Sequence, residues 1–413
     1  MKKIMSRLSY FTTLLILPLC FLSFSCEKNS KIRTVDQQQL FSLNYGLYEN
    51  ELLLSGNNSF APVDARIVMQ DGFFYISDNY AKKIMQFTSY GDLTGIIYND
   101  KTNPEPSFIH KIGSNSDDEQ NRIKSATHNA QIYDFNQLQK IAVDSHKSIF
   151  IVDSLPNERG EFDDKENILM KEIVLHFERD GSFKGYYGQE GLGGTPFPTI
   201  SDIFTTKDDE FVVVCKPRNE DFMIYWYNQS GALKWKIPIL ASYLPQTEED
   251  VFISIDRIVP DYEESVLYIK TDYYRVSIDE ELNVQSGIEY SYSMMHKFNI
   301  ESESFSQPLE IPPYEDVITD RFAKLTYKIP YNFLGVTENQ NFFFITPDET
   351  GLIIQIMSGN WQKAIKRHIK YDTIDAIHTN FSVSQDGIIS GLIALTDRTQ
   401  VVWWRTDGLI DKR

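Results

Sequence analysis

Apolar residues alternate with polar ones or form short β-branched and aromatic runs, which Asp, Asn, Gly and Ser bound. No long segment repeats an apolar residue every three to four positions, the spacing typical of an amphipathic helix. The chain also carries 27 Phe and 23 Tyr, residues that favour strands. The pattern predicts an all-β protein.

A strand–turn–strand unit recurs along the chain. Its clearest copy spans 67–78, where two apolar strands flank the Asp71-Gly72 turn and the second strand ends at Asp78. Further copies lie at 141–153, 203–214, 257–269, 333–345 and 381–390. Six such units predict a β-propeller of six four-stranded blades. The alternative is a two-sheet sandwich, which would leave several predicted strands unplaced.

The ring is expected to close through the N-terminal part of the domain. Apolar segments at 40–45 and 51–54 precede the first full unit, and the sixth unit ends shortly before the C-terminus. An N-terminal strand that completes the last blade would remove exposed sheet edges. We therefore expect a single propeller domain over 39–413.

Residues 1–25 have the pattern of a secretory signal. Lys2, Lys3 and Arg7 precede an uncharged, mostly apolar run over 8–24. The run is shorter than the ~20 apolar residues of a membrane-spanning helix, although an uncleaved anchor is an alternative.

Cys26 follows this run directly, after Ser25 and before a polar segment. The arrangement resembles the lipobox of bacterial lipoproteins, in the relaxed form seen in spirochaetes, because Ser23 and Phe24 depart from the usual pattern. The resemblance implies acylation of Cys26, a tether over 26–38, and anchoring to a membrane of the bacterial cell envelope, on its periplasmic or outer face. Cleavage without lipid, giving a soluble product, is the alternative.

The repeats also resemble a known propeller class. The units at 67–78 and 141–153 resemble NHL-type repeats, and the Gly-rich stretch 187–198 resembles the linker to a following blade. The resemblance is good from 60 to 200 and thin from 240 to 330. As a whole the chain resembles uncharacterised NHL-like propeller lipoproteins of spirochaetes, which implies a fold and a location and no reaction.

The net charge bears on the expected partners, and the cysteine content bears on disulfides. The formal net charge is −18, so the surface repels phosphate backbones and nucleic acid is not an expected partner. With Cys26 acylated and Cys20 inside the signal, Cys215 stands alone in an apolar strand. It is expected to be a buried, unreactive thiol, and no disulfide is expected.

No catalytic or metal-binding motif stands out. The seven histidines lack zinc-site spacing, and the carboxylates at 158–166 lack the regular offsets of a calcium loop. Asp78, Asp144 and Asp153 are candidates for a channel-facing catalytic set, but strand-ending Asp residues also cap turns by accepting backbone N–H bonds. We expect no cofactor and no metal, and a binding role rather than catalysis.

Three segments exceed what a blade needs, and recognition on rigid scaffolds usually uses such loops. They span 100–137, 154–170 and 271–330, and if all three emerge on one face, that face is the expected partner site; loop elaboration without function is the alternative. The last contains the candidate partner-binding residues Tyr290, Tyr292, Met294, Met295 and Phe298, whose alternative role is to cover a blade.

The sequence thus favours a membrane-tethered scaffold for a ligand or another envelope protein. The alternative is a metal-dependent hydrolase or lyase that uses the propeller channel. A purely structural envelope component is the third possibility.

Overall fold

A computed structural model describes residues 32–54, 62–111, 122–123, 128–164, 167–218, 221–245, 251–279, 284–320 and 323–410. The chain divides into two units, Met1–Arg33 and Thr34–Arg413, and the second contains the fold. Cys26 and the expected signal peptide lie outside the described residues. Within the ranges above, no helix is long and apolar enough to cross a membrane.

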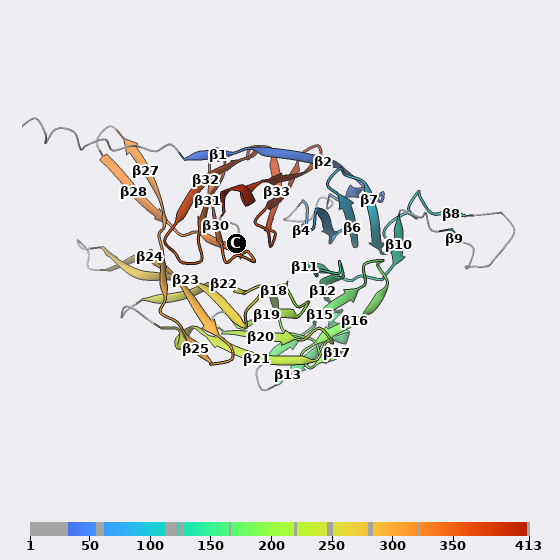
Figure 1. The fold of residues 1–413 in the computed structure, drawn as a ribbon, viewed down its shortest axis with the longest axis horizontal. Helices are drawn as coiled ribbons and strands as arrows, with labels where there is room; N and C mark the ends of the chain where they lie inside the picture. Colours follow the sequence, from blue (N-terminus) through green and yellow to red (C-terminus); the bar gives the residue numbers. More distant parts are fainter. Residues whose placement is uncertain are drawn as a thin grey trace, which may run out of the picture. The chain divides into compact units, whose positions relative to one another are not determined.

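The first three blades follow one another in the chain and are antiparallel sheets, except where stated (Figure 1). Blade one contains β4 (Ala65–Gln70), β5 (Phe73–Asp78), β6 (Lys83–Thr88) and β7 (Leu93–Tyr98), with β10 (Asn129–Ile132) parallel to β7. Blade two contains β11 (Leu138–Val143), β12 (Ile149–Ser154), β15 (Glu172–Phe177), β16 (Phe183–Gly188) and β17 (Gly191–Leu192). Blade three contains β18 (Ile200–Thr205), β19 (Phe211–Arg218), β20 (Asp221–Tyr227) and β21 (Leu233–Leu240).

The last three blades complete the ring. Blade four contains β22 (Phe252–Pro260), β23 (Val266–Asp279), β24 (Val284–Asn299), β25 (Ser304–Phe305) and β26 (Leu309–Ile311). Blade five contains β29 (Asn332–Val336), β30 (Phe342–Asp348), β31 (Gly351–Met357) and β32 (Ala364–Lys370), with β1 (Arg33–Val35) at its edge. Blade six contains β33 (Ala376–Val383), β34 (Ile389–Leu395), β35 (Thr399–Trp404), β2 (Gln37–Tyr45) and β3 (Glu51–Leu52). The predicted six-bladed propeller is confirmed.

Short elements lie outside these sheets. The two-stranded ribbons are β8 (His110–Lys111) with β9 (Arg122–Ile123), β13 (Glu161–Asp163) with β14 (Ile168–Met170), and β27 (Tyr314–Asp320) with β28 (Ala323–Ile329). The described 3-10 turns are η3 (Asn157–Arg159), η4 (Ala241–Tyr243) and η5 (Thr406–Leu409).

The N-terminal strand closes the ring, as predicted. β2 pairs antiparallel with β35, and the Tyr45 hydroxyl donates a 2.5 Å hydrogen bond to the carbonyl of Leu395 in the same blade. Strand pairing begins at Gln37 in β2, and β1 starts at Arg33, inside the segment expected as a tether. Residues 33–35 and 37–38 of the expected tether therefore belong to strands rather than to a free spacer.

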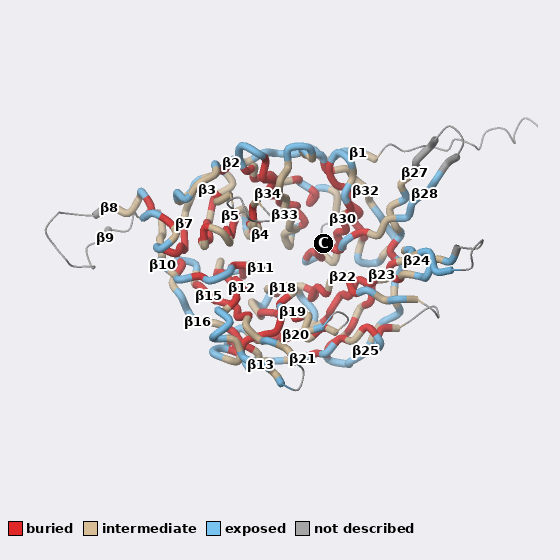
Figure 2. The backbone as a smooth tube through the Cα atoms, turned by 180° about the vertical axis from the view of Figure 1, so that it is seen from behind, coloured by how far each residue is buried: buried red, intermediate tan, exposed pale blue. Residues whose placement is uncertain are grey.

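The core lies largely between neighbouring blades, where buried side chains from facing sheets meet (Figure 2). Cys215 is one of them, packed with the apolar side chains of blades two and three, and burial raises the pKa of its thiol well above the usual value. Trp404 is fully buried while its neighbour Trp403 is only partly buried, as strand alternation requires.

The segment 271–330 is less of an insertion than its weak repeat match predicts. β23 and β24 are the two middle strands of blade four, and they continue for 14 and 16 residues. They exceed the six-residue middle strands of blade one, so the repeat pattern misses their ends. Within the described part of this segment, the insertion is the β27–β28 ribbon, which forms a separate sheet outside blade four.

Candidate functional site

The innermost strand of every blade lines one cavity at the centre of the propeller, with a volume of about 170 Å³. The C-terminal residues of these six strands all border it: Gln70, Val143, Thr205, Pro260, Val336 and Val383. The six strands therefore run in the same direction around the channel. Connections between the first and second strands of each blade lie at one face, which we call the turn face. Connections between the second and third strands, and those from one blade to the next, lie at the opposite face, which we call the loop face.

Five of the six innermost strands carry a β-bulge. Strand register shifts at Leu138/Ile141, Ile200/Asp202, Ile255/Arg257, Phe333/Gly335 and Ala376/His378. A bulge re-aims the side chains next to it, and three charged lining residues, Lys140, Asp202 and Arg257, lie at these shifts. The bulges thus bring charge to the channel from strands that otherwise present apolar side chains.

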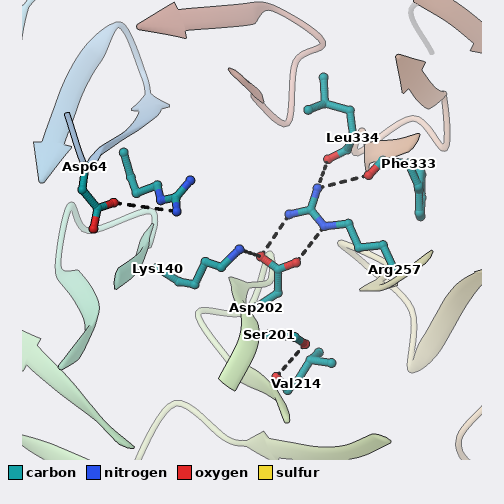
Figure 3. A network of polar contacts seen from close by, with 9 residues as sticks. Asp64, Lys140, Ser201, Asp202, Val214, Arg257, Phe333 and Leu334 are labelled. Carbon is teal, nitrogen blue, oxygen red and sulfur yellow. Dashed lines mark hydrogen bonds and ion pairs between the residues drawn. The ribbon is translucent and has the colours of Figure 1, made fainter. Parts of the chain in front are cut away.

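Asp202 and Arg257 form the centre of this charged cluster (Figure 3). Arg257 donates from Nε to Asp202 Oδ2 at 2.8 Å and from Nη2 to Oδ1 at 3.1 Å. Its Nη1 donates to the carbonyls of Phe333, at 3.3 Å, and Leu334. The guanidinium therefore joins blades three, four and five, and most of its N–H groups are already bonded.

Lys140 and Arg66 are less well neutralised. Lys140 Nζ lies 3.7 Å from Asp202 Oδ1, and Arg66 Nη2 lies 3.9 Å from Asp64 Oδ1. Both are long contacts, and the buried Nε of Arg66 has no hydrogen-bond partner among the described residues. Lys140 consequently stands beside a carboxylate that Arg257 already holds, and Arg66 makes one long contact with a separate carboxylate.

The pKa directions agree with this imbalance. The Asp202 carboxylate would raise the pKa of Lys140, but burial together with the charges of Arg257 and Arg66 lowers it below the usual value. Burial alone would raise the pKa of Asp202, and the charges of Arg257 and Lys140 overcome this and lower it. The cluster thus disfavours the positive charge that it carries, and an added anion would relieve it.

A buried polar chain extends from this cluster into blade four. Asp256, the bulge residue beside Arg257, accepts a 2.8 Å bond from the Phe333 N–H and lies 3.4 Å from Lys270 Nζ. Lys270, fully buried, donates to Asp272 at 2.6 Å, and Ser293 donates to the same carboxylate at 2.5 Å. These groups pair with one another and with the backbone, so they support the strands rather than a ligand.

The three Asp residues considered from the sequence accept backbone N–H bonds. Asp78 accepts from the N–H groups of Tyr80 and Ala81 at 3.0 Å each. Asp153 accepts from the Gln137 N–H at 2.5 Å, and Asp144 accepts from the Ser148 N–H at 2.7 Å. None of them borders the central cavity. Turn capping is confirmed for Asp78 and Asp144, whereas Asp153 bonds the segment before β11. The charged lining residues Lys140, Asp202 and Arg257 were missed because no sequence spacing marks a bulge.

One group of potential metal ligands gathers elsewhere among the described residues. Asp144, His146 and Asp209 come from the first turns of blades two and three, with ligand atoms within 4.8 Å of one another. Asp209 already accepts from the N–H and the hydroxyl of Ser145, both at 2.9 Å. These contacts connect the turns of two blades, a role that needs no metal.

The candidate partner-binding residues all lie on β24. Met295 and Phe298 are buried in blade four, so they offer no surface to a partner. Tyr290 bonds Ser293 at 2.8 Å, and the ring of Tyr292 stacks on Tyr273 at 4.4 Å. Partner binding through Tyr290, Tyr292 and Met294, which are half-buried, stays a prediction.

The sequence-derived insertions all belong to the loop face by their connectivity. Residues 100–137 join β7 to β11 between blades, and residues 154–170 join the second and third strands of blade two. The β23–β24 connection and the β27–β28 ribbon occupy equivalent positions in and after blade four. The turn face, in contrast, has compact hairpins.

No protein-family model and no curated protein matches the sequence. The comparisons therefore give no support to the NHL or spirochaetal resemblance. In structure the chain is similar to a PL25 polysaccharide lyase, an ulvan lyase solved with bound -[GlcA(1-4)Rha3S]-, at a TM-score of 0.43 and 10% identity over 89% of this chain and 95% of that one. It is also similar to XC5397 of Xanthomonas campestris, a gluconolactonase, at a TM-score of 0.39 and 10% identity over 90% and 96% of the two chains.

Proposed function

We propose that this protein is an envelope-anchored binding propeller whose central channel holds a small anionic ligand. The carrying observation is that two cations which line the cavity, Lys140 and Arg257, share one lining carboxylate, Asp202. Charge-assisted hydrogen bonds from such cations to a carboxylate, sulfate or phosphate are among the stronger ones in proteins. The 170 Å³ cavity suits one such group rather than a large molecule.

The anchor in this proposal is lipid on Cys26. It follows from the sequence pattern before and after this cysteine. Cys26→Ala should release the protein from the membrane fraction or leave an unprocessed precursor. Unchanged detergent partitioning of a normally processed chain would contradict the anchor and leave the channel proposal standing.

A metal-dependent hydrolase or lyase in the channel has less support. A calcium site needs several oxygen ligands, usually with more than one carboxylate. Among the described lining residues Asp202 is the sole carboxylate, and Arg257 occupies both of its oxygens. The geometry favours binding of an anion over binding of a cation.

Calorimetric titration with sulfate, phosphate and citrate tests the channel proposal. The parent protein should bind at least one of them, and Lys140→Met should weaken that binding about tenfold, as for loss of one charge-assisted bond. Lys184→Met is the matched control, since Lys184 is an exposed lysine of β16 paired with Glu178. Equal affinities in parent and Lys140→Met, or no binding of any of the three anions, would contradict the proposal.

Capture of another envelope protein is a second candidate function, favoured by exposed apolar side chains on the loop-face ribbons. They are Val276, Ile278, Val284 and Ile288 on β23–β24 and Val317, Leu325 and Tyr327 on β27–β28. Contiguous exposed apolar surface marks interaction sites. Since β23 and β24 form blade four, a deletion test must be restricted to the β27–β28 ribbon and the ends of β23 and β24. Deleting the ribbon and these strand ends should abolish crosslinking to partners in native envelopes. Retained crosslinking would contradict this function.

A further inference from the structure

A second and larger cavity, of about 570 Å³, opens on the loop face beside blade two. Its walls are the last residues of the first insertion, the start of the second insertion, and the Gly-rich linker before blade three. The two insertions are not needed to form a blade, and residues of β12, β15 and β16 complete the cavity. Their convergence on one cavity of ligand size therefore identifies a built site rather than a gap between strands. We call it the blade-two groove.

Aromatic side chains form part of the groove. Tyr133 comes from the first insertion, and Phe183 and Tyr186 come from β16. The rings of Tyr133 and Phe183 lie 5.0 Å apart between centroids, and Phe183 keeps 47% of its surface exposed. A half-exposed aromatic cluster inside a cavity offers an apolar surface that the fold itself does not bury.

Polar groups of both kinds surround these rings. Lys82 and Arg159 supply donors and Glu161 supplies acceptors, whereas the Asn136 amide already donates to the Ser154 carbonyl and the Thr195 hydroxyl to Glu190. Asp153 and Asp134 also line the groove, but their oxygens are already bonded, to the N–H groups of residues 136 and 137 and to Lys101 and Asn99. The groove is therefore mixed in charge, unlike the cationic channel.

The Gly-rich linker is shaped to complete this wall. A Cβ on Gly188 would lie 2.3 Å from the Gly194 carbonyl carbon, so only glycine permits the two backbones to approach. Glu190 accepts from the Thr195 N–H at 2.8 Å and holds the loop closed. The wall is thus fixed in place before any ligand arrives, which reduces the entropy lost on binding.

We propose that the blade-two groove binds a neutral saccharide. A pyranose ring has an apolar C–H face that packs on the negative face of an aromatic ring, and a rim of hydroxyls that both donate and accept hydrogen bonds. The groove supplies aromatic rings for the C–H face and polar side chains for the hydroxyls. It has no cationic excess to favour an anion.

The test uses two neutral probes, cellohexaose and chitohexaose, titrated calorimetrically into the full mature chain. At least one should bind, and Phe183→Ala should weaken its binding about tenfold. Tyr90→Ala is the control, because Tyr90 is an aromatic residue exposed to 87% and does not line the groove. Thermal melting of all three proteins verifies the fold. Since Phe183 is half-exposed, its replacement leaves the fold intact.

Three results would overturn the proposal. They are no binding of either hexasaccharide at millimolar concentration, equal weakening by Tyr90→Ala, and binding of an Ala-Gly decapeptide that Phe183→Ala abolishes while neither saccharide competes. Sulfate titration of the same samples keeps this inference apart from the channel proposal. If the parent protein binds sulfate but neither hexasaccharide, the groove proposal alone is rejected.

Discussion

Arg257 on β22 holds Asp202 on β18 through two parallel hydrogen bonds, of 2.8 Å and 3.1 Å. The pair joins blades three and four at the channel, and Arg257 reaches on to backbone carbonyls of blade five. Because Asp202 pairs with both Arg257 and Lys140, its loss would leave these two cations facing one another. The pair supports the ring and also sets the charge of the cavity.

Asp202→Asn should therefore destabilise the protein by about 3 kcal/mol, the usual cost of removing one partner of a largely buried ion pair. Urea unfolding measures the change. Asp397→Asn is the control, since Asp397 pairs with Arg398 at an exposed site and its loss should cost less than about 0.5 kcal/mol. If the two variants were equally stable, the central role of the Asp202–Arg257 pair would be wrong.

Anion binding should weaken at alkaline pH, and earlier than for an ordinary lysine site. The pKa of Lys140 is lowered because burial and the charges of Arg257 and Arg66 outweigh the attraction of Asp202. As pH rises through this lowered pKa, Lys140 loses its charge and the anion loses a partner. Lys140→Arg keeps the charge at every accessible pH, so it should shift the loss to higher pH. Sulfate titrations from pH 7 to pH 10 measure this, and identical profiles would contradict the role of Lys140.

His176 should make the fold sensitive to acid. The ring is buried against Phe150 at 4.3 Å, and neither nitrogen has a partner among the described residues. Burial lowers its pKa from 6.5 to about 4. As pH falls below 6.5 the unfolded chain binds this proton and the folded chain does not, so stability is lost until about pH 4.

His176→Phe removes that penalty and keeps the stacking. It should stabilise the protein slightly at pH 7 and by about 2–3 kcal/mol more near pH 4. His296, whose pKa burial also lowers to about 4, should keep part of the acid sensitivity in this variant. Melting temperatures measured from pH 7 to pH 4 test the prediction, which fails if the parent and variant curves stay parallel.

Ring closure by β2 should contribute strongly to stability. Leu43 on this strand is buried between blades six and one. Leu43→Ala should cost about 2–5 kcal/mol, as in other cores. Gln39→Ala on the same strand removes an exposed side chain and is the control, with almost no effect expected. Comparable small effects of both substitutions would show that β2 is not part of the cooperative fold.

The sequence predicts the scaffold better than the site. Hairpin units with Asp-Gly turns, such as Asp71 and Gly72, predict the blades because turn chemistry and alternation are local signals. Closure by residues 40–45 follows from their apolar pattern. Lys140, Asp202 and Arg257 belong to three different blades, and a bulge aims each of them at the channel. No local pattern reports such a register shift, so the cluster could be recognised only from the assembled ring.

The blade-two groove could not be predicted from the sequence either. Its three segments stood out in the sequence as two insertions and a Gly-rich linker. Their meeting around one cavity depends on the order of connections at the loop face. The length of β23 and β24 was missed for a related reason, since repeat spacing reports where blades recur and not how far a strand continues.

The most direct test of the account is to locate a heavy anion in crystals of the mature protein. Crystals soaked in selenate should show an anomalous peak in the central cavity, within hydrogen-bond distance of Lys140 Nζ, and Lys140→Met crystals should lose it. Selenate bound only at the outer surface, with no peak in the channel of the parent protein, would contradict the proposal that the channel is an anion site.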